Sequence, residues 1–169
     1  RTGPMPDPVF EAGRHALAFT RGVTEKLIAD LDETQLVFMP HGQANNALWN
    51  IGHIAHTDAY FLMKLGGPKS EIIEAWKGHF GGGSVCSPNA KDYPPIAKVR
   101  EEFHKQRQAV FDFFGQRTPA QLAQPMPEGL EFFAPTQGQF MAVVARHEGL
   151  HSGQISTARR SHGMPPTLG

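Results

Sequence analysis

The sequence has little of what marks several large protein classes. It holds a single cysteine, Cys86, among 169 residues, so neither an intrachain disulfide framework nor a multi-cysteine zinc site can form. Lys and Arg number 16, and so do Asp and Glu; this balance provides no net field for nucleic acid or an anionic lipid surface. No apolar run is long enough to span a bilayer. We therefore expect no nucleic-acid partner and no membrane partner.

Length and composition indicate one globular domain. A chain of 169 residues suits a single domain that buries about 70% of its unfolded surface. Hydrophobic residues without glycine make up 40% of the chain. When glycine is counted with them, the apolar fraction is that of an ordinary globular protein. No basic and then apolar leader opens the sequence, so a cytoplasmic protein is the default expectation. Residues 1–169 are predicted to form one domain, with the Pro- and Gly-rich residues 1–8 as a flexible lead-in.

Apolar residues recur at helical spacing in four long segments, and no segment alternates as a strand does. The Asp7-Pro8 pair is typical of a helix start, and Asn45 is the expected cap of the second helix. The connection over residues 66–95 is long enough for a crossover, and short helical turns are expected near 71–76 and 118–120. The prediction is an all-α four-helix bundle, antiparallel or crossed, with long connections and helices over 8–31, 45–65, 95–114 and 136–160.

Histidine is the residue in excess, with nine in the chain. His147 and His151 are four residues apart on the predicted fourth helix, about 6 Å along its axis. Both imidazoles can then reach one metal ion at about 2.0–2.1 Å. They also lie on the apolar face, where an imidazole without a partner is costly. This pattern favours a shared metal ion over a pair of hydrogen-bonded core histidines.

The same segment reads H-E-x-x-H, which in metalloproteases supplies two zinc ligands and a general base, here Glu148. A protease needs a third ligand, usually downstream, but residues 152–169 contain no Asp or Glu. Their one histidine, His162, would lie about 16 Å from His151 on a continuous helix. The protease is therefore the less favoured hypothesis. A third ligand is expected upstream, from His53 or His56 on the inward face of the second helix.

The remaining histidines have ordinary explanations as surface or hydrogen-bonded residues. These residues are His15, His41, His79, His104 and His162. Among them, His15 and His104 are weaker alternatives as metal ligands.

Two segments together resemble the DinB-like (YfiT-like) metal-dependent four-helix-bundle family. The first is Trp49-Asn50-Ile51-Gly52-His53-Ile54-Ala55 with Asp58 downstream, and the second is His147-x-x-x-His151-x-Gly153-Gln154-Ile155. The similarity extends from the first helix to Arg160. It implies His53, His147 and His151 as the metal ligands and leaves His56 as the reserve or as a neighbour that positions water or substrate. The family pattern does not fix the Gly-rich segment 81–89.

Three neutral imidazoles leave coordination positions open, which is typical of a catalytic metal site. Zinc and nickel both suit imidazole, and iron is a third option. The resemblance implies thiol-dependent chemistry with a low-molecular-weight thiol as partner, and homodimers. The expected function is a metal-dependent enzyme, of the thiol-dependent transferase or hydrolase type, that activates a thiol or water for a small-molecule substrate. The alternatives are a non-catalytic metal-binding or sensor bundle and a purely structural bundle.

No residue is assigned a catalytic role from the sequence, and Gln154, His56 and Tyr60 are the candidates for contact with substrate or water. Gln154 lies one turn beyond His151, and a helix–helix hydrogen bond is an equal explanation for it. His56 and Tyr60 follow His53 on the inward face of the same helix. Because ligating imidazoles must be neutral, we expect acid to release the metal near or below about pH 6.

Several neighbours have a functional and a structural interpretation. Asp58 can support a ligand imidazole or form a surface ion pair, and Trp49 can line a pocket or fill the core. Glu148 lies about 100° around the helix from His147, so it is expected to face solvent or a subunit interface. A carboxylate-bearing thiol could pair with basic residues of the fourth helix, but a solvated helix end is the default for Arg146, Arg159 and Arg160.

Overall fold

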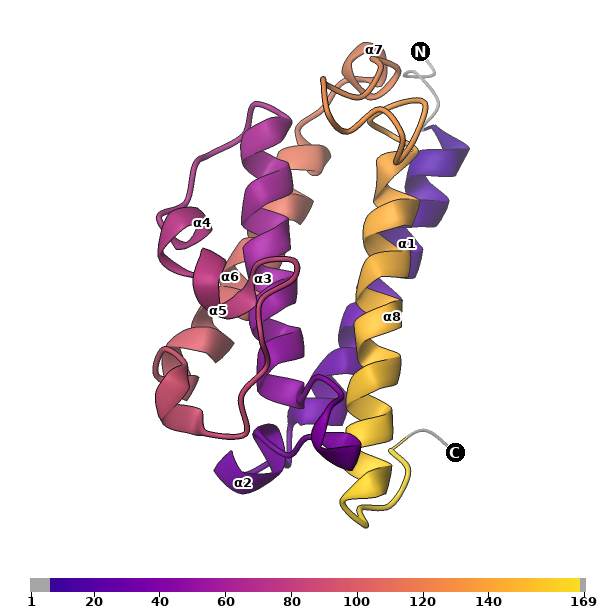
Figure 1. Cartoon of the computed structure of the whole chain (residues 1–169). Coiled ribbons are helices and arrows are strands. Elements are labelled where there is room, and N and C mark those ends of the chain that lie inside the picture. Colours follow the sequence, from indigo (N-terminus) through magenta and orange to yellow (C-terminus); the bar gives the residue numbers. More distant parts are fainter. Residues whose placement is uncertain (1–6, 168–169) are drawn as a thin grey trace.

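The computed structural model describes residues 7–167, and this part of the chain is all-α (Figure 1). Strand pairing within it is limited to one isolated bridge between Pro125 and Thr136. No helix within 7–167 is long and apolar enough to cross a membrane. The four long helices are α1 (Pro8–Ile28), α3 (Ala47–Lys64), α6 (Ile96–Gly115) and α8 (Phe140–Ser161). The short elements are α2 (Glu33–Leu36), η1 (Pro40–Gly42), α4 (Ile72–Ala75), α5 (Lys77–Phe80), η2 (Ala90–Asp92) and α7 (Pro119–Leu122).

The first long helix starts at the expected capping residue, whereas two other expected helix starts are shifted along the chain. Asp7 caps α1, because its carboxylate accepts hydrogen bonds from the backbone of Val9 and Phe10. Of the expected flexible lead-in, Asp7 and Pro8 belong to this helix start, and residues 1–6 lie outside the described residues. The second long helix is capped by Asn46 rather than Asn45, since the Asn46 side chain accepts from Trp49 N at 2.8 Å.

The last long helix begins at Phe140, not near residue 136 as the sequence indicated. The preceding backbone is bonded elsewhere: Gln137 N donates to Gln124 O and Gly138 N to Leu122 O, both at 2.9 Å. These bonds tie the loop after α7 to the start of α8. Residues 137–139 form a turn, and the helix begins at Phe140.

The bundle consists of two parallel helix pairs, α1 with α8 and α3 with α6 (Figure 1). Along α1 and α8 the contacts advance together, from Gly13 against Met141 to Arg21 against Glu148. Asp58 of α3 meets Arg107 of α6, and the carbonyl of Leu65 accepts from Arg117. Between the pairs the direction reverses. Parallel neighbours need a long connection, so the segment between α3 and α6 is the crossover that the sequence left room for.

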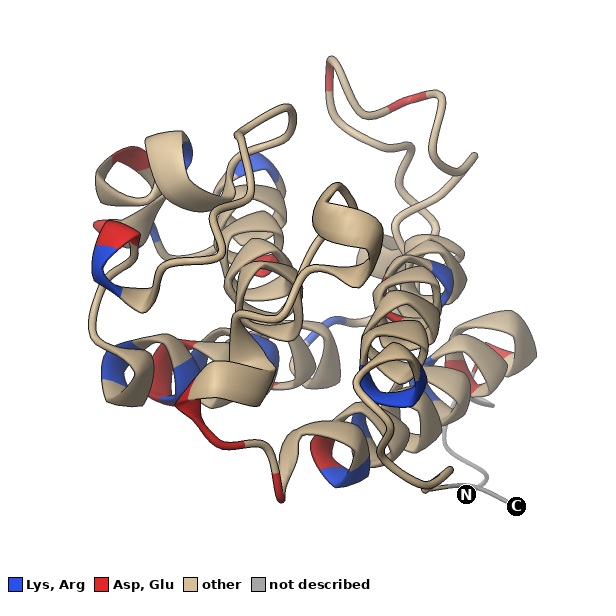
Figure 2. Ribbon diagram, turned by 60° about the horizontal axis from the view of Figure 1, so that its bottom comes forward, with Lys and Arg blue, Asp and Glu red and all other residues tan. Residues whose placement is uncertain are grey.

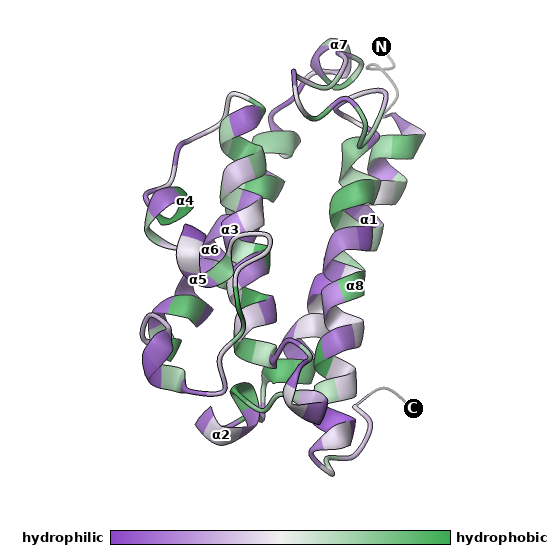
Figure 3. Cartoon of the chain, viewed as in Figure 1, coloured by the Kyte–Doolittle hydropathy of each residue, from purple (hydrophilic) through white to green (hydrophobic). Residues whose placement is uncertain are grey.

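Side chains in the bundle form two hydrophobic clusters with a charged layer between them. One cluster includes Leu27 and Phe103, and the other includes Leu17 and Val110. Arg21 lies between Leu17 and Leu27 on α1, and the other long helices place one buried charge each at the same level. Hydrophobic and hydrophilic residues follow one another along each long helix (Figure 3), as in amphipathic helices. Elsewhere acidic and basic residues are interspersed along the ribbons (Figure 2).

Candidate metal centre

Three histidines from two antiparallel helices converge near the middle of the bundle. His53 comes from α3, and His147 and His151 come from α8. The Nε2 atom of His147 lies 3.3 Å from that of His53 and 3.2 Å from that of His151. One nitrogen from each residue lies within 4.8 Å of the other two. His53 and His147 are half-buried and His151 is buried, so the group is partly accessible to solvent.

The ring of His53 is held from two directions. Its Nδ1 lies 2.7 Å from the carbonyl oxygen of Phe80, at the end of α5. A carbonyl oxygen only accepts, so Nδ1 carries the proton and the neutral ring presents its Nε2 lone pair to the centre. The indole of Trp49 stacks on the imidazole at 4.7 Å and an interplanar angle of 8°. Trp49 is therefore both a wall of the site and part of the core.

Burial keeps the three imidazoles neutral. Loss of hydration, together with the neighbouring histidines, lowers the pKa of His147 to about 3 and that of His151 to about 4. Burial also lowers the pKa of His53, although the Phe80 carbonyl opposes the shift. Neutral imidazole is the form that binds a metal ion. Imidazole nitrogens only 3.2–3.3 Å apart need either a proton between them or a cation among them, and neutral ring nitrogens are good ligands for such a cation. The donor set therefore fits a divalent ion.

Fold and site together define a helical-bundle protein with a three-histidine group able to hold a metal ion. Residues 16–155 match the model of the DinB superfamily, and the chain belongs to that family. The resemblance inferred from the two histidine-containing segments is thereby confirmed. None of the curated proteins compared with the chain matches it significantly.

The structure places the other predicted site residues outside the group of three. His56 is buried, with Nε2 2.9 Å from the carbonyl oxygen of Ile73, so this nitrogen is a donor committed to the connection after α3. Tyr60 packs at the boundary of the two hydrophobic clusters. Gln154 is half-buried, and its Oε1 makes no hydrogen bond within residues 7–167. Gln154 nevertheless lies close enough to His151 to raise the pKa of that imidazole, and its contact with substrate or water stays a prediction.

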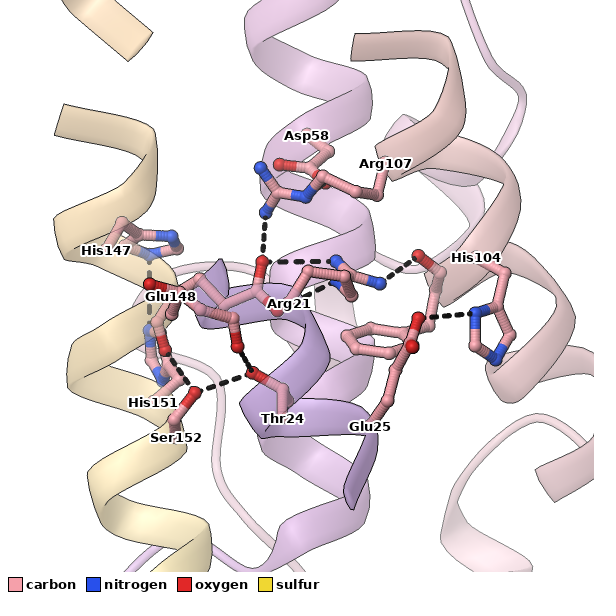
Figure 4. A network of polar contacts seen from close by, with 12 residues as sticks. Arg21, Thr24, Glu25, Asp58, His104, Arg107, His147, Glu148, His151 and Ser152 are labelled. Atoms are coloured by element: carbon pink, nitrogen blue, oxygen red, sulfur yellow. Dashed lines mark hydrogen bonds and ion pairs between the residues drawn. The ribbon is translucent and has the colours of Figure 1, made fainter. Parts of the chain in front are cut away.

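Glu148 does not face solvent or a subunit interface, which corrects the expectation from helical phase. It is 0% exposed, and its carboxylate lies 2.8 Å from Arg21 Nε and 2.8 Å from Arg107 Nη2 (Figure 4). A carboxylate held by two guanidinium groups is unavailable as the general base that a metalloprotease requires. This placement argues against the H-E-x-x-H hypothesis.

Asp58 forms an ion pair, which was one of its two expected roles, but the pair is buried rather than on the surface, and Asp58 does not support a ligand imidazole. It is 1% exposed and forms an ion pair with Arg107 at 3.1 Å. Burial raises the pKa of Asp58 to about 6, although both arginines oppose the shift. Arg21, Asp58, Arg107 and Glu148 thus form a buried quartet with one member from each long helix. No sequence signal pointed to this quartet, because its members are brought together only by the bundle.

The three arginines of the last helix, expected by default to form a solvated helix end, differ from one another in the structure. Arg159 is 4% exposed, pairs with Asp30, and donates from Nη1 to the carbonyl oxygen of Leu27 at 2.9 Å. It therefore fastens the end of α1 and is neither solvated nor free for a ligand. Arg146 and Arg160 are exposed.

Gly52→Ala is expected to disturb both the fold and the site. A Cβ atom there would lie 2.3 Å from the ring of Phe80, which is fully buried and whose carbonyl orients His53. Overpacking of this kind costs about 1–3 kcal/mol, which for a chain of this size lowers Tm by roughly 2–4 °C per kcal/mol. Thermal unfolding and zinc titration measure the two effects. Gly153→Ala, where a Cβ meets nothing within 4 Å, is the matched control. Equal behaviour of the two variants would contradict the prediction.

Acidification is expected to destabilise the metal-free protein between about pH 6.5 and 4. His147 and His151 have folded pKa values of about 3 and about 4, below the reference of about 6.5. In this range each histidine is neutral in the folded state and protonated in the unfolded state. Its contribution to the free energy of unfolding is therefore fully present above pH 6.5 and is lost as the pH falls. Asp58 acts oppositely, because its raised pKa makes it release a proton, but the two histidines outnumber it. Tm measured against pH without metal should therefore fall; a flat profile would contradict the assignment. Because the free imidazoles bind protons only at low pH, metal release should need a pH well below the value of about 6 that the reference pKa of histidine suggested.

Proposed function

We propose that this protein is a metal-dependent enzyme in which His53, His147 and His151 hold a zinc or nickel ion that activates a small thiol or water. The observation that carries the proposal is the convergence of three imidazole nitrogens, one from each histidine and all within 4.8 Å of one another. Iron is the third choice of metal. A divalent ion bound by neutral imidazoles keeps its full charge and lowers the pKa of a bound thiol or water.

The residues around the three histidines hold the ligand imidazoles in place and leave the group partly exposed. Phe80 and Trp49 close the α3 side and hold His53 in place. His53 and His147 are only half-buried, which leaves part of the group accessible to a small-molecule substrate. Gln154 offers a hydrogen-bond acceptor beside His151. In this proposal the chain's residues fix the metal and orient its ligand, and a low-molecular-weight thiol is the co-substrate.

Elemental analysis of protein purified without a histidine tag is the first test. We expect one equivalent of divalent metal per chain, and absence of metal after reconstitution with zinc, nickel or ferrous iron would overturn the proposal. Loaded protein is then assayed with glutathione, bacillithiol and mycothiol against a common electrophile, and with activated esters for hydrolysis. Metal-free protein is the control. Stoichiometric metal without metal-dependent turnover in any assay would favour the non-catalytic sensor alternative.

A further inference from the structure

Asn50 lies beside the three histidines, on α3 and one turn before His53. It is fully buried. Its Oδ1 lies 2.6 Å from Nδ1 of His151 on α8. Its Nδ2 lies 2.8 Å from the carbonyl oxygen of Asn46, with a longer contact of 3.5 Å to that of Asn45. The side chain thus joins the first turn of α3 to an imidazole of the other helix pair.

The hydrogen-bond network determines which way the Asn50 amide points. The carbonyl oxygen of Asn46 can only accept, so the NH₂ group of Asn50 must face it and the oxygen must face His151. Asn46 is itself fixed: its Oδ1 caps α3 through Trp49 N, and its Nδ2 donates to Ser87 O at 2.7 Å. The orientation of Asn50 is therefore set by the backbone at the start of α3 and by the connection that crosses it.

This orientation dictates the proton position on His151. An amide oxygen accepts, so Nδ1 of His151 must donate, and the neutral ring then has an unprotonated Nε2. That Nε2 is the atom 3.2 Å from His147. We propose that Asn50 is a positioning residue that selects this tautomer and ring orientation of His151, so that Nε2 is presented to the metal. The inference rests on the proposed function for its metal, but the tautomer is a property of the metal-free protein.

The test measures the tautomer of His151 in metal-free protein and, separately, the affinity of the protein for Zn²⁺. Long-range ¹H–¹⁵N correlation spectra of ¹⁵N-labelled, metal-free wild type at pH 7 distinguish protonated from unprotonated ring nitrogens. We expect His151 to be protonated at Nδ1 alone. In Asn50→Leu, which keeps comparable bulk and removes the acceptor, we expect a second tautomer protonated at Nε2 and a 10–100-fold loss of affinity for Zn²⁺, the range found for partners of metal-ligating histidines.

Ser152→Ala is the matched control. Ser152 is next to His151 and buried, but its hydroxyl bonds to Thr24 at 2.6 Å and to Glu148 O at 2.9 Å, not to the imidazole. It should lower stability and leave the His151 tautomer and zinc affinity unchanged. Wild-type His151 protonated at Nε2, or Asn50→Leu with an unchanged tautomer and unchanged affinity, would overturn the inference. If wild type binds no metal, the proposed function fails, and the tautomer spectra still decide the role of Asn50.

Discussion

His53→Ala is expected to abolish stoichiometric metal binding, whereas His56→Ala is expected to retain it. His53 supplies one of the three convergent nitrogens, while Nε2 of His56 is committed to the carbonyl of Ile73. Loss of hydrogen-bond partners of ligands already costs 10–100-fold in affinity. Loss of a ligand should therefore exceed about 100-fold, or about 2.7 kcal/mol. Elemental analysis after dialysis and calorimetric titration with zinc measure the difference.

His147→Ala and His151→Ala complete the series and should behave like His53→Ala. Each variant removes one nitrogen of the group and leaves the fold, so circular dichroism should stay helical in all four proteins. His56→Ala removes a buried hydrogen bond and should lower Tm without lowering the metal content. Metal kept in His53→Ala but lost in His56→Ala would instead make His56 the third ligand and overturn the assignment.

The sequence alone predicted the helices and two of the three histidines, because both depend on local periodicity. The i, i+4 spacing of His147 and His151 places them on one helix face wherever the helix packs. The choice between His53 and His56 depends on how α3 is rotated against α8, and three residues on a helix differ by about 60°. Periodicity could not resolve that angle. The family resemblance could, and the geometry agrees with it.

Other features depend on contacts between distant segments. Helical phase placed Glu148 away from His147 and hence toward solvent, but α8 packs against α1 on one side and α3 on another. A helix with more than one partner has more than one buried face. The connection after α3 carries the carbonyl of Phe80, 27 residues from His53. No local pattern marks a backbone carbonyl as the partner of an imidazole, so this role emerged only from the folded chain.

Glu148→Ala is expected to be the most destabilising single substitution in the bundle. Arg21 and Arg107 are 6% and 2% exposed and share this carboxylate. Its removal leaves three buried charges, two positive and one negative, in a layer closed off by hydrophobic clusters. Breaking a buried ion pair by removing one partner costs about 3–5 kcal/mol. For a domain of this size, Tm should fall by roughly 2–4 °C for each kcal/mol.

Two further variants distinguish the loss of charge balance from a simple loss of packing. Glu25→Ala removes a carboxylate from an exposed pair with His104 and should change stability by less than about 0.5 kcal/mol. Arg21→Met added to Glu148→Ala restores neutrality, because Asp58 and Arg107 then balance. The double variant should therefore be destabilised by clearly less than the sum of the two single variants, a coupling expected only of groups in one network. Strict additivity in urea unfolding would show that the four charges do not act as a unit.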